Sequence, residues 1–149
     1  MNMLVTGGAG FLGKAIVQRL LQQGHHVKSL CRGDYPELEA MGVEVIRGDL
    51  ADESIVLRAA ENCDRIYHVA AKAGVWGSYD DFYKPNVVGT QNVLTACRHH
   101  GISKLIYTST PSVIHAGGDV EGIDESEPYP DHFETHYPAT KAMAEKMVL

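Results

Sequence analysis

Long hydrophobic runs are absent from this 149-residue sequence, and no apolar stretch approaches the about 18–20 residues needed to span a bilayer. Cysteine is scarce. Cys31, Cys63 and Cys97 are odd in number, widely spaced and free of any CxxC pair, so neither a disulfide framework nor a zinc site is predicted. The first residues lead into a glycine turn without a basic segment, so no signal peptide is expected. These absences favour a cytoplasmic protein with reduced thiols.

Positive charge is also in deficit, because the net charge is −6 and the sequence pI is about 5.7. This balance argues against nucleic acid or an anionic membrane as the main partner. His132 and His136 have a spacing that can bind metal on a helix, but nearby prolines interrupt a helix there, so we expect no metal site. The acidic stretch from Asp119 to Glu127 is predicted to be a solvated loop. The expected partner is a small molecule, and the sequence leaves a homodimer open.

Short apolar runs alternate with helical patterns along the chain. The patterns predict strands over residues 3–6, 26–31, 43–47, 65–69 and 104–109, and helices over 11–23, 54–60, 86–100 and from 137 onward. Alternation at this spacing predicts parallel βαβ units, and therefore an α/β fold with a doubly wound parallel sheet. Ligands bind at the carboxyl ends of the strands in such sheets, so motifs that follow the first, third and fifth strands should converge there.

The strongest local motif is the glycine turn Thr6-Gly7-Gly8-Ala9-Gly10-Phe11-Leu12-Gly13, between the first predicted strand and the first predicted helix. Gly7 permits a tight turn, Gly10 lets the backbone approach a pyrophosphate, and Gly13 allows the helix to pack closely on the strand. The helix start at Phe11 and Leu12 offers free N–H groups and positive partial charge to a phosphate. This context predicts that the turn binds a dinucleotide.

The end of the second predicted strand bears on the choice between NAD and NADP. An acidic residue there would bind the adenosine ribose hydroxyls, but this chain has Cys31-Arg32, and Asp34 comes later, past the expected strand end. A guanidinium can pair with a 2′-phosphate in bidentate fashion. We therefore favour NADP over NAD; the alternative is that Arg32 stacks on adenine or faces water.

Two further strand ends carry residues suited to a dinucleotide. In Gly48-Asp49-Leu50, Asp49 is placed either to accept from the adenine amino group or to cap the next helix, with Leu50 beside it. After the fourth strand, the small residues Ala70 and Ala71 leave room for the cofactor. The preceding His68 is more readily explained as a hydrogen-bonded strand histidine than as a catalyst.

A cluster of hydroxyl side chains ends the fifth predicted strand, from Tyr107 to Ser112, and Tyr137-Pro138-Ala139-Thr140-Lys141 follows later. Positions i and i+4 share one face of a helix, so Lys141 is expected beside the Tyr137 phenol. A free phenol has a pKa of about 10, and a nearby ammonium favours its phenolate, which suits acid–base work at neutral pH.

Together these motifs resemble the short-chain dehydrogenase/reductase superfamily, in its extended branch with a Rossmann fold. The glycine turn, the Gly48-Asp49-Leu50 triplet, the helix start from Asn86 to Thr90, the hydroxyl cluster and the Tyr-Lys pair occur in family order. The hydroxyl cluster and the Tyr-Lys segment look most like the 3β-hydroxysteroid dehydrogenase-like group. Within it, the bacterial 2-alkyl-3-oxoalkanoate reductases are more similar than the sterol dehydrogenases, particularly around Val75-Trp76-Gly77.

The resemblance implies a role for each matching residue. Tyr137 would be the general acid/base, and Lys141 would assist it and bind the nicotinamide ribose. Thr110 would hydrogen-bond the substrate oxygen, with Ser109 as the alternative, and Asn86 matches a position close to the cofactor. Members continue into a C-terminal substrate domain, whereas residues 139–149 here have a helical pattern up to the last residue. We therefore expect residues 1–149 to be a truncated dinucleotide-binding domain, able to bind cofactor without turnover.

The sequence leaves three functional classes to weigh. The first is a ketoreductase or alcohol dehydrogenase acting on a β-keto acid or ketosteroid-like compound. The second is a nucleotide-sugar epimerase or dehydratase; against it, Pro111-Ser112 replace the dehydratase Asp-Glu pair, and the strand-two acid is missing. The third is a cofactor-binding module without catalysis, which would be expected to lose Tyr137 or Lys141, yet both are present.

Overall fold

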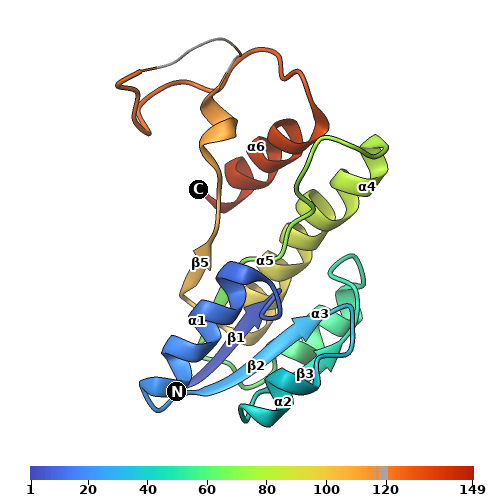
Figure 1. The fold of residues 1–149 in the computed structure, drawn as a ribbon, viewed down its shortest axis with the longest axis vertical. Helices are drawn as coiled ribbons and strands as arrows, with labels where there is room; N and C mark the ends of the chain where they lie inside the picture. The colour runs from blue at the N-terminus through green and yellow to red at the C-terminus, as the bar shows by residue number, and fades with distance from the viewer. Residues whose placement is uncertain (116, 118–120) are drawn as a thin grey trace.

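A parallel five-stranded sheet forms the centre of the computed structural model, which describes residues 1–115, 117 and 121–149 (Figure 1). All its neighbouring strands pair in parallel, in the order β3-β2-β1-β4-β5. The strands are β1 (Asn2–Thr6), β2 (His26–Cys31), β3 (Glu44–Arg47), β4 (Arg65–His68) and β5 (Leu105–Tyr107). The predicted doubly wound α/β fold is confirmed, and β2 has the predicted bounds.

Helices cover both faces of the sheet because the strands are apolar on both sides. From β1, Met3 and Val5 point into one core and Leu4 into the other. The first core packs against α1 (Phe11–Gln22) and α2 (Pro36–Ala40), and the second against α3 (Glu53–Ala60) and α5 (Gly89–His100). The sequence prediction missed α2, which is a short helix that begins on a proline.

The helix predicted over residues 86–100 begins earlier than expected. It starts as α4 (Tyr79–Tyr83), passes through a π-helical turn (Lys84–Val88) and continues as α5. Ser78 and Asp81 form a capping box at its start: the Ser78 hydroxyl accepts from the Asp81 N–H, and the Asp81 carboxylate accepts from the Ser78 N–H. The π turn accommodates Pro85, so this proline lies inside the continuous helical segment.

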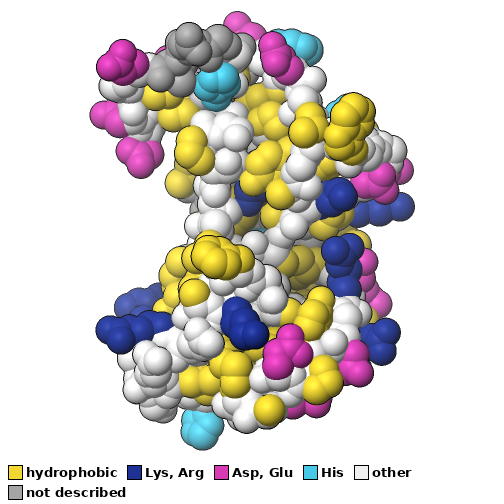
Figure 2. Space-filling view, viewed as in Figure 1, with side chains coloured by type: hydrophobic (Ala, Val, Ile, Leu, Met, Phe, Trp, Pro, Cys, Tyr) yellow, Lys and Arg dark blue, Asp and Glu magenta, His cyan; other side chains and the backbone are white. Residues whose placement is uncertain are grey.

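The upper part of the molecule in Figure 1 holds α4 and α6 (His136–Val148), which contact each other. A 3₁₀ turn (Pro111–Ile114) follows β5, and the described residues 121–135, which form neither helix nor strand, lead into α6; Asp119 of the predicted acidic loop lies outside the described residues. In Figure 2 the molecule is narrower between this upper part and the lower part that carries the sheet. None of the helices in the described part of the chain has the length and hydropathy that a membrane crossing requires.

Candidate functional site

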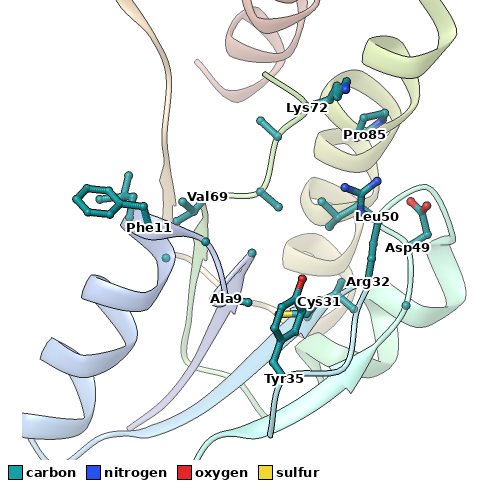
Figure 3. A pocket seen from close by; sticks show the side chains of 18 residues that line it. Ala9, Phe11, Cys31, Arg32, Tyr35, Asp49, Leu50, Val69, Lys72 and Pro85 are labelled. Carbon is teal, nitrogen blue, oxygen red and sulfur yellow. The ribbon is translucent and has the colours of Figure 1, made fainter. Parts of the chain in front are cut away.

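A pocket of about 320 Å³ lies at the carboxyl ends of the strands (Figure 3). Ten of the residues predicted to bind the cofactor line it: Gly7, Gly10, Phe11, Leu12, Gly13, Arg32, Asp49, Leu50, Ala70 and Ala71. The motifs that follow β1, β2, β3 and β4 therefore meet in one cavity at the edge that a parallel sheet provides, whereas the hydroxyl cluster after β5, predicted to converge there too, does not line it. Asn86, Tyr137 and Lys141 do not line this pocket.

The glycine turn shapes the end of the pocket at the start of α1. Gly7 has φ +73°, a conformation that side chains rarely adopt, and a Cβ at Gly13 would collide with the carbonyl oxygen of Gly7. No side chain caps α1, and its first turn carries no acidic residue. The N–H groups at this helix end are thus not satisfied by a capping side chain, which suits them to a phosphate.

The opposite end of the pocket holds a cation and an aromatic ring. Arg32 and Tyr35 rise into it from the segment after β2, whereas the Phe11 ring points away (Figure 3). Arg47 Nε donates to the backbone carbonyl oxygen of Arg32 at 3.3 Å, so a β3 side chain holds the backbone from which Arg32 enters the pocket. Asp34 does not line the pocket. The sequence prediction did not include Tyr35 among the pocket residues. The only sequence signal for it was its position shortly after the end of β2.

Asp49 lines the pocket, but its carboxylate is already engaged locally. Its Oδ1 accepts from the Ala51 N–H at 2.9 Å, while the neighbouring Asp52 caps α3 by accepting from Ser54 and Ile55 N–H groups. The helix-capping role considered for Asp49 therefore belongs to Asp52, and Asp49 stays available at the pocket wall through its second oxygen.

A directed chain of hydrogen bonds runs beneath the pocket from β1. The Thr6 hydroxyl accepts from the N–H groups of Val69 and Ala70, so it donates to His68 Nδ1 at 2.8 Å. His68 Nε2 then donates to the Thr90 hydroxyl at 3.0 Å, and Thr90 donates to the Asn86 carbonyl oxygen. Burial lowers the pKa of His68 to about 3, which keeps the imidazole neutral. His68 is a buried, fully hydrogen-bonded histidine, as the sequence favoured.

Asn86 supports the pocket wall and does not itself face the cavity. Its amide is 2% exposed; Oδ1 accepts from the Lys72 N–H at 2.8 Å, and Nδ2 donates to the Lys72 carbonyl oxygen at 3.0 Å. The same Nδ2 donates to the Thr140 hydroxyl at 3.0 Å. Asn86 thus ties the segment after β4 to α6, at a residue between Tyr137 and Lys141 in the sequence.

Lys141 is almost completely enclosed, with 4% of its surface exposed. Its ammonium donates to the Thr108 carbonyl oxygen at 2.6 Å and lies 4.2 Å from the centroid of the Tyr107 ring. Burial lowers the pKa of this ammonium to about 8, and the Glu145 carboxylate opposes that shift. Among the described residues, no hydrogen bond joins Lys141 to the Tyr137 hydroxyl, so the expected direct pairing is not seen.

Tyr137 lines a second cavity of about 330 Å³, together with Gly74, Val75, Ser112, His115, Gly117, Glu134, Thr135 and Pro138. The segment after β4 connects the two cavities, because Ala70, Ala71 and Lys72 line the first and Gly74 and Val75 the second. A ligand that extends along this segment from the first cavity would reach Tyr137. Thr110, which the resemblance makes the substrate-binding hydroxyl, does not line either cavity.

The fold and the pocket define a class, the extended short-chain dehydrogenases/reductases, whose nucleotide-binding half they reproduce. Residues 4–149 match the 3-beta hydroxysteroid dehydrogenase/isomerase family, and the chain belongs to that family. It is 54% identical over 151 residues to the 2-alkyl-3-oxoalkanoate reductase of Stenotrophomonas maltophilia (strain K279a), covering 100% of this chain and 46% of the relative. It is 39% identical over 160 residues to a 3 beta-hydroxysteroid dehydrogenase/Delta 5-->4-isomerase of Mycobacterium tuberculosis (strain CDC 1551 / Oshkosh), covering 99% of this chain and 42% of the relative.

Solved structures agree on the fold. The UDP-glucose 4-epimerase of Thermus thermophilus, in complex with NAD, matches with a TM-score of 0.85 and 34% identity, over 99% of this chain and 50% of the other. The chain thus spans about half the length of the relatives it matches.

Proposed function

We propose that this protein is an NADP-dependent ketoreductase that interconverts a ketone and a secondary alcohol. The observation that carries the proposal is the arrangement of the two cavities along one segment. A dinucleotide pocket lies at one end, and Tyr137 lies in a second cavity at the other. Two relatives at 54% and 53% identity bear the name 2-alkyl-3-oxoalkanoate reductase, which supports a β-keto acid as the substrate class.

The chain's residues have distinct tasks in this reaction. The nicotinamide, when bound, supplies the hydride to the substrate carbon or accepts it. In the reducing direction Tyr137 donates its phenolic proton to the oxygen, and in the reverse direction it removes that proton. Lys141 lies one helical turn further along α6, and we assign its ammonium to binding the nicotinamide ribose. With a pKa of about 8, Lys141 remains mostly protonated at neutral pH.

Arg32 supports NADP as the preferred cofactor. Its side chain lines the pocket beyond β2, and the nearest carboxylate in the sequence, Asp34, does not line it. A guanidinium at this place favours a 2′-phosphate, which a carboxylate would repel. Several of the similar solved structures hold NAD, so a preference for NADH is the competing outcome.

The test compares wild type with Tyr137→Phe in protein expressed from the complete gene. We expect wild type to oxidise NADPH only when a 2-alkyl-3-oxo acid is added, and Tyr137→Phe to lose about 10²–10⁴-fold in kcat. Tyr83→Phe is the matched control, because the Tyr83 ring stacks on Tyr79 and lines neither cavity. Wild type that oxidises no NADPH with a panel of ketones, but interconverts nucleotide sugars with bound NAD, would establish the epimerase instead.

A further inference from the structure

The Lys141 ammonium is a buried charge with no ion-pair partner among the described residues. Its hydrogen bond there goes to the Thr108 carbonyl oxygen at 2.6 Å, although an ammonium has three hydrogens to donate. The Glu145 carboxylate, one helical turn further along α6, is engaged elsewhere, because it accepts from the hydroxyl groups of Ser109 and Tyr129. A buried charge is costly unless a partner compensates it, so another group must stabilise this one.

We propose that the Tyr107 ring is a positioning residue that holds the Lys141 ammonium for the cofactor ribose. This inference rests on the proposed function, in which Lys141 binds that ribose. The ammonium lies over the Tyr107 ring, 4.2 Å from its centroid. The face of an aromatic ring carries negative partial charge and attracts a cation most strongly when water is excluded. Because the ring takes up no N–H hydrogen bond, two ammonium hydrogens stay uncommitted to the described residues and can donate to ribose hydroxyls.

The fold fixes the ring at the end of β5. Tyr107 is the last residue of this strand, and its register partner in the parallel pair is His68 of β4. The two rings are in contact, with 5.7 Å between their centroids, and His68 is itself held by hydrogen bonds to Thr6 and Thr90. Thr108, whose carbonyl oxygen accepts from the ammonium, is the next residue along the chain. Two adjacent residues at the end of β5 therefore supply both contacts of the ammonium.

The ring of Tyr107 performs this role without its hydroxyl group. The hydroxyl oxygen is buried and has no hydrogen-bond partner among the described residues. Burial raises the pKa of the phenol, so the side chain stays neutral and contributes no full negative charge beside the ammonium. A phenylalanine ring would present a similar negative face to the cation, whereas an aliphatic side chain would present none.

The ionisable groups around Lys141 stay in place when Tyr107 is replaced, so a change in the pKa of Lys141 can be traced to the ring. Burial lowers the pKa of Lys141 to about 8, and Glu145 opposes that shift. His68 is neutral, because burial lowers its pKa to about 3. The other charged and imidazole side chains of the elements packed against α6 are Asp80 and Asp81 on α4, Lys84 in the π turn, and Arg98, His99 and His100 on α5.

The experiment measures the Kd for NADPH by fluorescence titration at about pH 6.5 and 8.5, in protein expressed from the complete gene. Tyr107→Leu removes the ring and should lower the pKa of the ammonium by about one unit. It should therefore raise the Kd about tenfold at the higher pH, and less than about twofold at the lower pH, where both proteins keep the charge. Tyr107→Phe should stay within about twofold of wild type at both. Tyr83→Leu is the matched control, because the Tyr83 ring stacks on Tyr79 and lines neither cavity.

Fluorinated phenylalanine in place of Tyr107 keeps the shape of the ring and weakens the negative charge of its face, so it serves if Tyr107→Leu does not fold. The Kd at the higher pH should rise with each added fluorine. The inference is overturned by a loss in Tyr107→Leu that is equal at the two pH values, by an equal loss in Tyr107→Phe, or by fluorination without effect. Wild type that shows the expected pattern but reduces no ketone overturns the ketoreductase function alone, whereas wild type that binds no NADPH overturns both proposals.

Discussion

Replacing Lys141 by methionine is expected to stabilise the fold even though it removes an active-site amine. Lys141 is 4% exposed, and burial lowers the pKa of its ammonium from the usual 10.5 to about 8. Because a tenfold change in proton affinity corresponds to about 1.4 kcal/mol, keeping this charge buried at neutral pH costs the fold about 3 kcal/mol. Methionine also loses the contacts with Thr108 and the Tyr107 ring, so the expected net gain is about 1–2 kcal/mol.

The pH dependence of this gain follows from the sign of the pKa change. The folded ammonium loses its proton near pH 8, whereas the unfolded one keeps it up to about pH 10.5. In that interval the unfolded state binds more protons, so the free energy of unfolding of the wild type rises with pH. The variant lacks the group, so its advantage is full below pH 8 and shrinks as the pH rises toward 10.5.

Urea denaturation followed by circular dichroism measures both quantities, at about pH 7, 8.5 and 10. Lys146→Met is the matched control, because Lys146 lies on the same helix, is exposed, and covers only the Tyr129 ring. The control should change the free energy of unfolding by less than about 0.5 kcal/mol at each pH. A Lys141→Met variant that is less stable than wild type at neutral pH, or whose advantage does not vary with pH, would show that the buried ammonium does not destabilise the fold.

Two further variants probe the pocket. Arg32→Ala should raise the KM for NADPH by about 10–100-fold and leave that for NADH within about twofold, since only NADPH carries the 2′-phosphate. Equal changes of the two KM values in steady-state kinetics would show that Arg32 does not select the cofactor. Arg19→Ala is the control. Asn86→Ala should lower the free energy of unfolding by about 3 kcal/mol, because it removes the buried amide that pairs with the half-buried backbone of Lys72 and with the Thr140 hydroxyl. Urea titration beside the exposed Gln91→Ala measures this, and a loss below about 0.5 kcal/mol would contradict it.

The sheet could be predicted because its strands are short apolar runs with clear boundaries. β2 lies between Gly24 and Gly33, and its prediction from His26 to Cys31 matched the structure. The start of the helix before α5 could not be predicted in the same way. Pro85 signals a break when it is considered alone, whereas the capping box at Ser78 and the π turn overrule that signal.

The site shows a similar division. The residues at strand ends converge because parallel topology brings them to one edge, so Gly7, Arg32 and Ala70 line a single pocket. Asn86 is linked to the pocket only through Lys72, a tertiary contact that spacing does not reveal. The assignment of a single hydroxyl near Thr110 depends on how the chain turns after β5, and a one-residue difference in register changes which side chain faces the cavity.

The proposed ketoreductase function depends on hydride passing directly between the cofactor and the substrate carbon. The most direct measurement uses NADPH carrying deuterium at the transferred position of C4, a 2-alkyl-3-oxo acid, and protein expressed from the complete gene. We expect mass spectrometry and NMR of the product to find deuterium on the new carbinol carbon. Product formed without deuterium from either C4-labelled epimer of the cofactor, or deuterium-free epimerisation of a nucleotide sugar with no NADPH consumed, would contradict it.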